Sequence, residues 1–238
     1  MKTETRTVET PDGPMQVYVA HPDEQPSRAA IVIQEAFGVN DHIQDVTRRA
    51  ASAGYLAVAP HVFHRTGGGV VKYGDMEGVM KHFQGVSDKG TLDDVDATLG
   101  LIREEEIGDE STGIFGFCLG GRMTFLAGAE RALGAAVSFY GGGIVTGRSE
   151  TMPSLVPKVA SMKTPWLGLF GDLDKGISVD DVERLRAALK DAPVETEIVR
   201  YADAGHGFHC DARPEAYHAD AAADGWKRTL AWFDEHLK

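Results

Sequence analysis

Cysteine is scarce in this sequence: only Cys118 and Cys210 occur among its 238 residues. Two cysteines form one disulfide at most, which argues against a small secreted domain held together by disulfides. Basic residues are also in short supply, because 24 lysines and arginines stand against 36 aspartates and glutamates, for a formal net charge of -12. That balance argues against nucleic acid and against an anionic membrane surface as partners.

Long apolar runs are absent as well. No stretch approaches the roughly 20 residues that a bilayer-spanning helix needs, and the opening segment MKTETRTVET has no apolar core of the kind found in secretory signals. We therefore expect a cytoplasmic protein with no membrane partner. The chain also has no internal repeat, low-complexity tract or long linker, so we expect one domain over residues 1–238.

The chain does contain a regular alternation of short apolar runs with amphipathic segments. Such runs are typical of buried parallel strands. Strands that alternate with helices predict an α/β fold: a doubly wound, mostly parallel sheet with helices on both faces and active-site loops at the carboxyl ends of the strands. The turn residues Asp12-Gly13 predict an antiparallel hairpin at one edge. The expected parallel strands are Ala29–Gln34, Tyr55–Ala59, Gly113–Phe117, Ala135–Tyr140, Trp166–Phe170 and Glu195–Tyr201.

Two capping signals and one irregular segment stand out between the strands. Thr91 with Asp94 has the spacing of a capping box and predicts a helix start, and Ser178 with Asp181 does the same farther along. The stretch 61–89 is rich in glycine and histidine and only weakly periodic. We expect this stretch to form a lid or loop over a site.

The strongest chemical signal is the string GFCLGG (Gly116–Gly121), between an expected strand and an expected helix. It fits the G-x-nucleophile-x-G elbow, with Cys118 in the place of serine. The flanking glycines relieve the crowding of a strained turn, and the start of the following helix favours a thiolate and a developing oxyanion. The alternatives are an inert buried cysteine in a Gly-rich turn and a phosphate loop, although no G-K-[ST] or G-x-G-x-x-G follows.

A nucleophile elbow predicts an acid and then a histidine farther along the chain. His206 fits the histidine, because it lies in a glycine-flanked loop ahead of the last expected helix. The acid is Asp172 or Asp174, both directly after the expected strand Trp166–Phe170. Aspartate is also a common turn former, which is a second explanation for Asp172.

Four strings together resemble those of the dienelactone hydrolases, and the similarity extends over nearly the whole chain. They are IQEAFGVN (Ile33–Asn40), GFCLGG (Gly116–Gly121), GDLD (Gly171–Asp174) and GHGF (Gly205–Phe208). The resemblance implies an α/β-hydrolase fold with Cys118 as nucleophile and His206 as general base and acid. By the spacing of the family, it also implies that Asp174 orients His206.

The resemblance implies roles for three further residues. It implies that the backbone N–H groups of Leu119 and Ala36 hold the oxyanion, and that Glu35 helps to convert the Cys118 thiol to thiolate when substrate binds. Such activation is needed because a free thiol with a pKa of about 8.5 is only a few per cent ionised at pH 7.

The sequence departs from the family at the substrate-binding arginines. Dienelactone hydrolases hold the substrate carboxylate with arginines, one of them four residues after the triad histidine, where this chain has Cys210. The segment Val70–Lys89 contains no arginine, and the nearest substitutes, Arg65 and Arg213, lie outside the family register. We therefore expect neutral short-chain esters or uncharged lactones to be better substrates than free-acid dienelactone. The residues expected around the pocket are Phe37, His64, Arg65, Tyr140 and Phe208.

These observations predict a hydrolase of the carboxymethylenebutenolidase type that cleaves a small-molecule ester or lactone by a Cys-His-Asp triad through an acyl-enzyme. A general carboxylesterase or thioesterase would use the same residues. A catalytically silent ligand-binding protein is the alternative outside catalysis, and the complete triad argues against it. The pairs His61-x-x-His64 and His206-x-x-His209 match no known metal-ligand set, so we expect neither metal nor cofactor. The sequence leaves monomer or dimer open.

Overall fold

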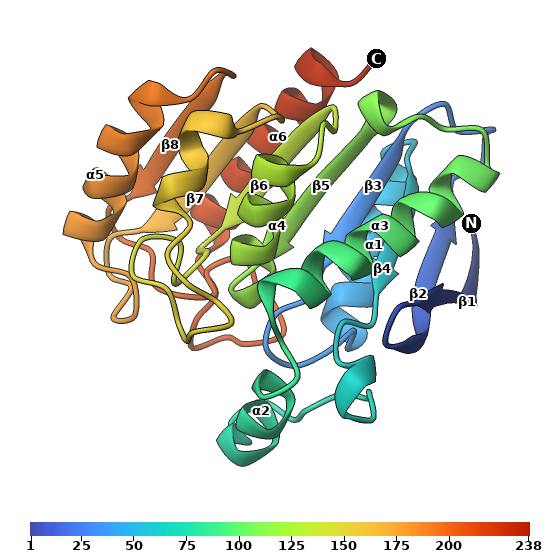
Figure 1. Ribbon diagram of the computed structural model, residues 1–238, viewed down its shortest axis with the longest axis horizontal. Helices are drawn as coiled ribbons and strands as arrows, with labels where there is room; N and C mark the ends of the chain where they lie inside the picture. The colour runs from blue at the N-terminus through green and yellow to red at the C-terminus, as the bar shows by residue number, and fades with distance from the viewer.

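The computed structural model describes all 238 residues and is built around one eight-stranded sheet (Figure 1). The strands lie in the order β1-β2-β4-β3-β5-β6-β7-β8. Neighbours from β4 to β8 are parallel, whereas β1 pairs with β2, and β2 with β4, in antiparallel fashion. The expected mostly parallel α/β sheet is confirmed. The strands are β1 (Lys2–Thr10), β2 (Gly13–His21), β3 (Ala29–Ile33), β4 (Leu56–Pro60), β5 (Thr112–Phe117), β6 (Ala135–Phe139), β7 (Trp166–Gly171) and β8 (Thr196–Tyr201).

The strand predictions from apolar runs agree with the structure to within one residue at each end. Strands β3 to β7 are buried along their whole length, which is why their sequences are continuous apolar runs rather than alternating ones. The edge hairpin is also confirmed: β1 and β2 meet at Asp12-Gly13, where Gly13 has a φ of 110° that suits glycine.

Helices cover both faces of the sheet. Figure 1 shows α3 and α4 in front of it and α6 behind it. On the rear face α1 approaches α6, because the ring of His209 lies between those of His42 and Trp226, at centroid distances of 6.0 and 6.3 Å. The α-helices are α1 (Asp41–Ser52), α2 (Met76–Phe83), α3 (Asp88–Glu104), α4 (Leu119–Glu130), α5 (Val179–Ala188) and α6 (Ala219–His236). Short 3₁₀ turns are η1 (His64–Thr66), η2 (Asp109–Ser111), η3 (Val156–Ser161) and η4 (Leu189–Asp191).

One of the two capping predictions is confirmed and the other is wrong. The Ser178 side chain accepts a hydrogen bond from the Asp181 N–H at 3.1 Å and begins α5. Helix α3, however, begins at Asp88, where Ser87 is the cap. Asp94 lies buried inside α3, and its carboxylate binds side chains from the 61–89 segment instead of a helix terminus.

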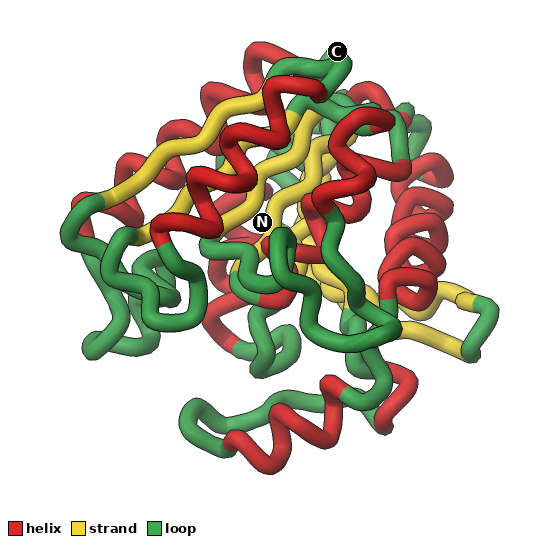
Figure 2. The backbone as a smooth tube through the Cα atoms, turned by 60° about the vertical axis from the view of Figure 1, so that its left-hand side comes forward, coloured by secondary structure: helices red, strands yellow, loops and turns green.

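The 61–89 segment carries η1 and α2, and both Figures 1 and 2 show α2 standing clear of the sheet at the end where the site lies. Val62, Phe63 and Val86, at the two ends of the segment, belong to the main core. Between them, Val71 and Val79 form a small cluster with Ala36, separate from the main core, against which Phe37 and Phe83 pack. The segment is therefore anchored in the core at its ends and held by the small cluster in its middle.

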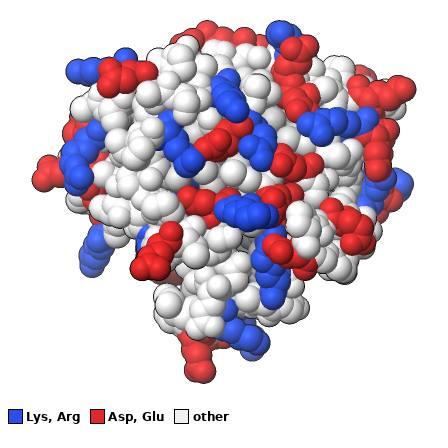
Figure 3. Space-filling view, viewed as in Figure 1, with Lys and Arg blue, Asp and Glu red and all other residues white.

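No helix combines the length and the apolar composition needed to cross a membrane. Charged side chains of both signs are intermingled over the face seen in Figure 3.

Candidate active site

Cys118 occupies a strained turn between β5 and α4. Its φ of 55° and ψ of -112° are unusual for a residue with a side chain. A Cβ on Gly116 would lie 2.4 Å from the carbonyl oxygen of Gly120, and one on Gly120 would lie 2.4 Å from that of Ile33. Only glycine therefore permits the turn that presents the Cys118 side chain at the carboxyl end of the sheet.

His206 and Asp174 meet after β8 and β7. The Nδ1 atom of His206 lies 2.6 Å from Oδ2 of Asp174. The other oxygen, Oδ1, accepts hydrogen bonds from the N–H groups of Gly176 and Ile177 at 2.7 and 3.1 Å, so this carboxylate is held on both sides. Asp172 faces away and forms a two-bond ion pair with Arg200 at 2.7 and 2.8 Å. Of the two acids left open by the sequence, Asp174 is the one that contacts His206.

The charge on His206 depends on its two neighbours. Burial alone would lower its pKa, but a negative charge on Cys118 and the hydrogen bond to Asp174 outweigh burial and raise the pKa of His206 to about 10. The imidazole therefore keeps its second proton at neutral pH beside an ionised Cys118.

Glu35 is a buried carboxylate directly after β3. Its Oε1 accepts hydrogen bonds from the Tyr140 hydroxyl and from Arg213, each at 3.2 Å, while its Oε2 has no partner. Burial and the charge of Glu35 raise the pKa of Tyr140 well above its ordinary value, so the phenol stays protonated and donates. Tyr140 is thus a support for Glu35 and not part of the cavity surface.

Two backbone N–H groups beside Cys118 have no acceptor within the protein. Leu119 is the first residue of α4, and Ala36 belongs to the turn after β3; neither N–H donates a hydrogen bond. The two segments are in contact, since the N–H of Gly120 donates to the carbonyl of Gln34 at 3.1 Å. Free N–H groups at a helix start suit a developing negative charge.

A cavity of about 740 Å³ opens at this end of the sheet. Its wall includes Cys118, His206, Asp174 and Glu35, and the 61–89 segment adds an apolar side through α2. A cavity of this size can hold a drug-sized molecule, so a simple lactone also fits inside it. The further apolar lining residues that matter below are Phe37, Met76, Val79 and Phe83.

Four of the five expected pocket residues lie elsewhere, and Tyr140, described above, is one of them. His64 and Arg65 both bind the buried carboxylate of Asp94, and Arg65 also binds Asp12, because α3 begins earlier than predicted and places Asp94 beneath them. Phe208 is fully buried against Tyr140 and Phe139. Of the expected wall, only Phe37 lines the cavity.

Two arginines line the cavity. Arg213, one of the two substitutes that the sequence offered for the family's substrate-binding arginines, contacts Glu35, and Arg148 comes from the glycine-rich loop after β6. Arg148 was not among the expected pocket residues, because no motif or regular pattern marks the loop that holds it. Both cations bear on the expectation of neutral substrates, which was drawn from the missing arginines of the family register.

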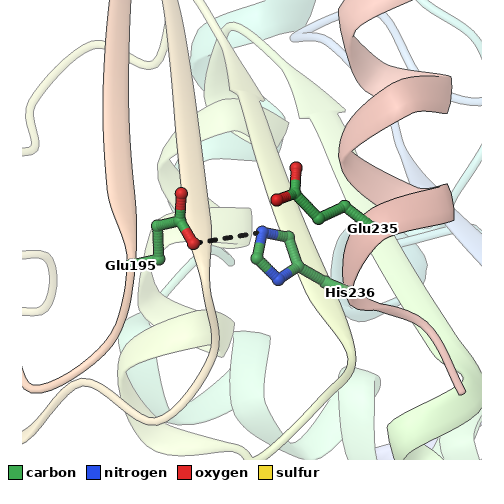
Figure 4. A group of neighbouring side chains, drawn as sticks. All are labelled: Glu195, Glu235 and His236. Atoms are coloured by element: carbon green, nitrogen blue, oxygen red, sulfur yellow. Dashed lines mark ion pairs between the residues drawn. The ribbon is translucent and has the colours of Figure 1, made fainter.

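The pair His206 and His209 does not converge on a common point. His206 faces Cys118, whereas His209 packs among the rings of Phe117 and Phe139, and burial lowers its pKa to about 3. One group of potential metal ligands, Glu195, Glu235 and His236, joins the start of β8 to the end of α6 (Figure 4). It lies at the opposite edge of the sheet from Cys118 and has no part in the cavity.

The strand order, the strained cysteine turn after β5, the aspartate after β7 and the histidine after β8 define the chain as an α/β hydrolase. The model of the dienelactone hydrolase family matches residues 15–237. The chain belongs to that family and is a hydrolase.

Relatives and solved structures agree with this assignment. A candidate carboxymethylenebutenolidase from Yersinia pestis is 38% identical over 234 residues, covering 97% of this chain and 87% of the relative. A protein of the same name from Escherichia coli K12 is 39% identical over 228 residues, covering 93% and 83%. The crystal structure of a candidate dienelactone hydrolase from Klebsiella pneumoniae superimposes with a TM-score of 0.89 at 36% identity, covering 99% of this chain and all of that one.

Proposed function

We propose that this protein hydrolyses a carboxylic ester or lactone by a Cys118-His206-Asp174 triad through an acyl-enzyme. The observation that carries the proposal is that one cavity holds a cysteine on a strained turn and a histidine hydrogen-bonded to a fixed carboxylate, and that two backbone N–H groups beside this cysteine have no acceptor. Each part has a place in acyl transfer, and together they serve no need of a binding protein.

In the first half of the reaction, the Cys118 sulfur attacks the substrate carbonyl. The carbonyl oxygen gains negative charge and is stabilised by the N–H groups of Leu119 and Ala36. Protonated His206 then gives its Nε2 proton to the departing alkoxide, and the acyl group remains on sulfur.

In the second half, His206 acts as a base. Once Cys118 carries an acyl group it has no negative charge, so the strongest influence that raises the pKa of His206 is removed. Neutral His206 then accepts a proton from water, which attacks the thioester and releases the acid. The hydrogen bond to Asp174 keeps the other ring nitrogen protonated throughout.

Glu35 is proposed as the group that receives the proton of Cys118 when the resting enzyme is a thiol. It lines the same cavity, and its Oε2 is buried without a partner. Burying a carboxylate oxygen without a hydrogen-bond partner lowers the stability of the folded protein. Oε2 of Glu35 is such an oxygen, and it is available to take a proton.

The direct test is a panel of short activated esters and lactones, with and without iodoacetamide. We expect hydrolysis that iodoacetamide abolishes, together with a mass increase equal to the acyl group on the peptide containing Cys118 after rapid acid quenching. Tight ligand binding without turnover of any ester in the panel would instead identify a silent binding protein.

The pH dependence gives a further prediction. Because the pKa of His206 is about 10 in the free enzyme, the protonated form persists from neutral pH upward and is lost only as the pH rises through that value. We expect kcat/KM to fall on the basic side near pH 10, and Asp174→Asn to move this limb downward, since it removes one cause of the raised pKa. A profile that rises through pH 7 and stays level to pH 11 would contradict the assignment.

Arg148 leads to a prediction about substrate charge. Among the fourteen arginines of the chain, it is the one without an ion pair. Each of the other thirteen arginines forms at least one ion pair with an aspartate or glutamate. Its Nε donates to the Gly142 carbonyl at 3.2 Å, and its guanidinium lies 5.8 Å from the Phe83 ring. A Cβ on Gly142 or Gly143 would come within 2.6 Å of it, so the loop makes room for a free cation at the cavity.

We expect this cation to favour esters with a carboxylate at the far end of the acyl chain. Charge-assisted hydrogen bonds contribute about 1.5–3 kcal/mol, so Arg148→Gln should lower kcat/KM for mono(4-nitrophenyl) adipate by roughly tenfold or more. The value for 4-nitrophenyl hexanoate, which has a methyl in place of the carboxylate, should change by no more than about twofold. Arg184→Gln, which removes an equal charge on α5, is the control. Equal losses for both esters would contradict the prediction.

A further inference from the structure

The cavity wall on the His206 side differs in character from the wall that α2 provides. In the proposed reaction the Nε2 proton of His206 passes to the leaving oxygen, so the alcohol part of the ester lies beside His206. The loops after β7 and β8 form this side, and they place the charged residues Lys175, Asp203 and Glu215 on the wall. The α2 side is apolar. The alcohol part of the substrate therefore meets a polar surface.

His218 belongs to this polar side. It lines the cavity, and its backbone N–H donates to the carbonyl of Phe208 at 2.9 Å. The loop that leads to His218 also packs against the turn of His206, because a Cβ on Gly207 would lie 3.5 Å from the Cβ of Ala216. The backbone of His218 is thus tied to the residues that directly follow His206.

The hydrogen bond that begins α6 fixes the tautomer of His218. Its Nδ1 accepts from the N–H of Ala221 at 3.3 Å, so Nδ1 carries no proton. The proton of the ring is then on Nε2, which makes this atom a donor. No other hydrogen bond joins the His218 side chain to the protein. Nε2–H is therefore a free donor on a residue of the cavity wall.

Histidine is not among the residues preferred at a helix N-cap, which are Asn, Asp, Ser and Thr. The other α-helices with a side-chain cap use preferred residues, at 2.9–3.1 Å: Asn40, Asp75, Ser87 and Ser178. The cap of α6 is longer, at 3.3 Å. A shorter side chain would cap α6 at least as well, but it would not extend a donor beyond the cap. The choice of histidine is explained if its second nitrogen is used.

We propose that His218 is a specificity-determining residue, whose Nε2–H donates a hydrogen bond to an oxygen in the alcohol part of the ester. The preferred substrates are then esters of oxygen-bearing alcohols, such as glycol ethers, rather than esters of simple alkyl alcohols. This inference rests on the proposed function, which places the alcohol part beside His206. It gives His218 no part in proton transfer, which stays with His206.

Two substitutions separate the two nitrogens of His218. In His218→Asn, Oδ1 takes the place of Nδ1 and keeps the cap, while no donor reaches the position of Nε2. In His218→Gln, the side-chain amide nitrogen reaches the position of Nε2, but the cap is lost because glutamine is not a capping residue. The midpoint of thermal unfolding should therefore fall by about 2–4 °C in His218→Gln and stay unchanged in His218→Asn.

The readout is the ratio of kcat/KM values within two matched pairs of butyrate esters: 2-methoxyethyl against butyl, and 3-methoxypropyl against pentyl. The members of a pair differ by one ether oxygen in place of a methylene group. A neutral hydrogen bond changes such a ratio by about two- to tenfold, so we expect His218→Asn to lower it about fivefold in at least one pair. His218→Gln should keep it within about twofold of the wild type. His21→Asn, on β2 outside the cavity, is the control and should change neither ratio.

Wild-type ratios in His218→Asn, or a fall in His218→Gln as large as that in His218→Asn, would overturn the inference. An equal loss for both members of each pair would do the same, because a packing defect acts on both. The esters are also titrated into Cys118→Ala with and without His218→Asn, and their Kd values are measured by ligand-observed NMR. Binding needs no turnover. If no ester is hydrolysed, the proposed function fails, while an unequal change in Kd within a pair still supports the role of His218.

Discussion

Cys118→Ala should abolish ester hydrolysis and leave the fold intact. Cys118 is the proposed nucleophile: it lies on the strained turn, it shares a cavity with His206, and two backbone N–H groups without an acceptor lie beside it. Loss of the nucleophile in a triad costs on the order of 10⁶-fold in kcat, which would place the residual rate near that of the uncatalysed reaction. The measurement is kcat for a 4-nitrophenyl ester, with an active-site titration of the wild type to exclude contamination.

The fold is expected to survive because the Cys118 side chain is only partly buried and accepts no hydrogen bond from the first turn of α4. An unchanged thermal unfolding midpoint is the control. If hydrolysis persists at more than about a thousandth of the wild-type rate, Cys118 is not the nucleophile, and the acyl adduct should be sought on another residue.

Asp174→Asn should lower kcat by about 10⁴-fold, the loss seen when the orienting carboxylate of a triad becomes an amide. The amide would donate to Nδ1 of His206 instead of accepting from it, so the proton would move to Nε2 and the ring could no longer take a proton from water. The same change should lower the pKa of His206, which one-dimensional NMR of the imidazole protons measures independently of turnover.

Asp172→Asn is the matched control, because it makes the same chemical change two residues away. Its carboxylate binds Arg200 on β8 and does not touch His206. The pair is partly exposed to solvent, and ion pairs near the surface contribute about 1 kcal/mol or less, so we expect a small loss of stability and nearly full activity. Comparable losses from the two substitutions would show that the acid has been misassigned.

The sequence predicted the parts of the site that depend on local patterns. The string GFCLGG determines its own backbone conformation, because a Cβ on Gly116 or on Gly120 would collide with a carbonyl oxygen. The order of Cys118, Asp174 and His206 along the chain follows from the strand order, since parallel strands bring their carboxyl ends to one edge. The strands themselves were predictable because burial on both faces leaves a continuous apolar run.

Other parts were not predictable because they depend on contacts between distant segments. His64 and Arg65 were expected at the pocket, but the start of α3 places Asp94 where it binds both. The cap at Ser87 was missed because Thr91 with Asp94 imitates a capping box one turn later. Arg213 reaches Glu35 only because the chain turns back after Cys210, and no short motif encodes that turn.

The weak attachment of the middle of the 61–89 segment has a consequence for how proteins with this architecture diversify. The side of the cavity formed by α2 rests on the small cluster of Ala36, Val71 and Val79, apart from the main core. Mutations in α2 should therefore reshape this side of the cavity at little cost to the sheet that holds Cys118, Asp174 and His206. Selection can then change the shape of the cavity on this side without changing those three residues.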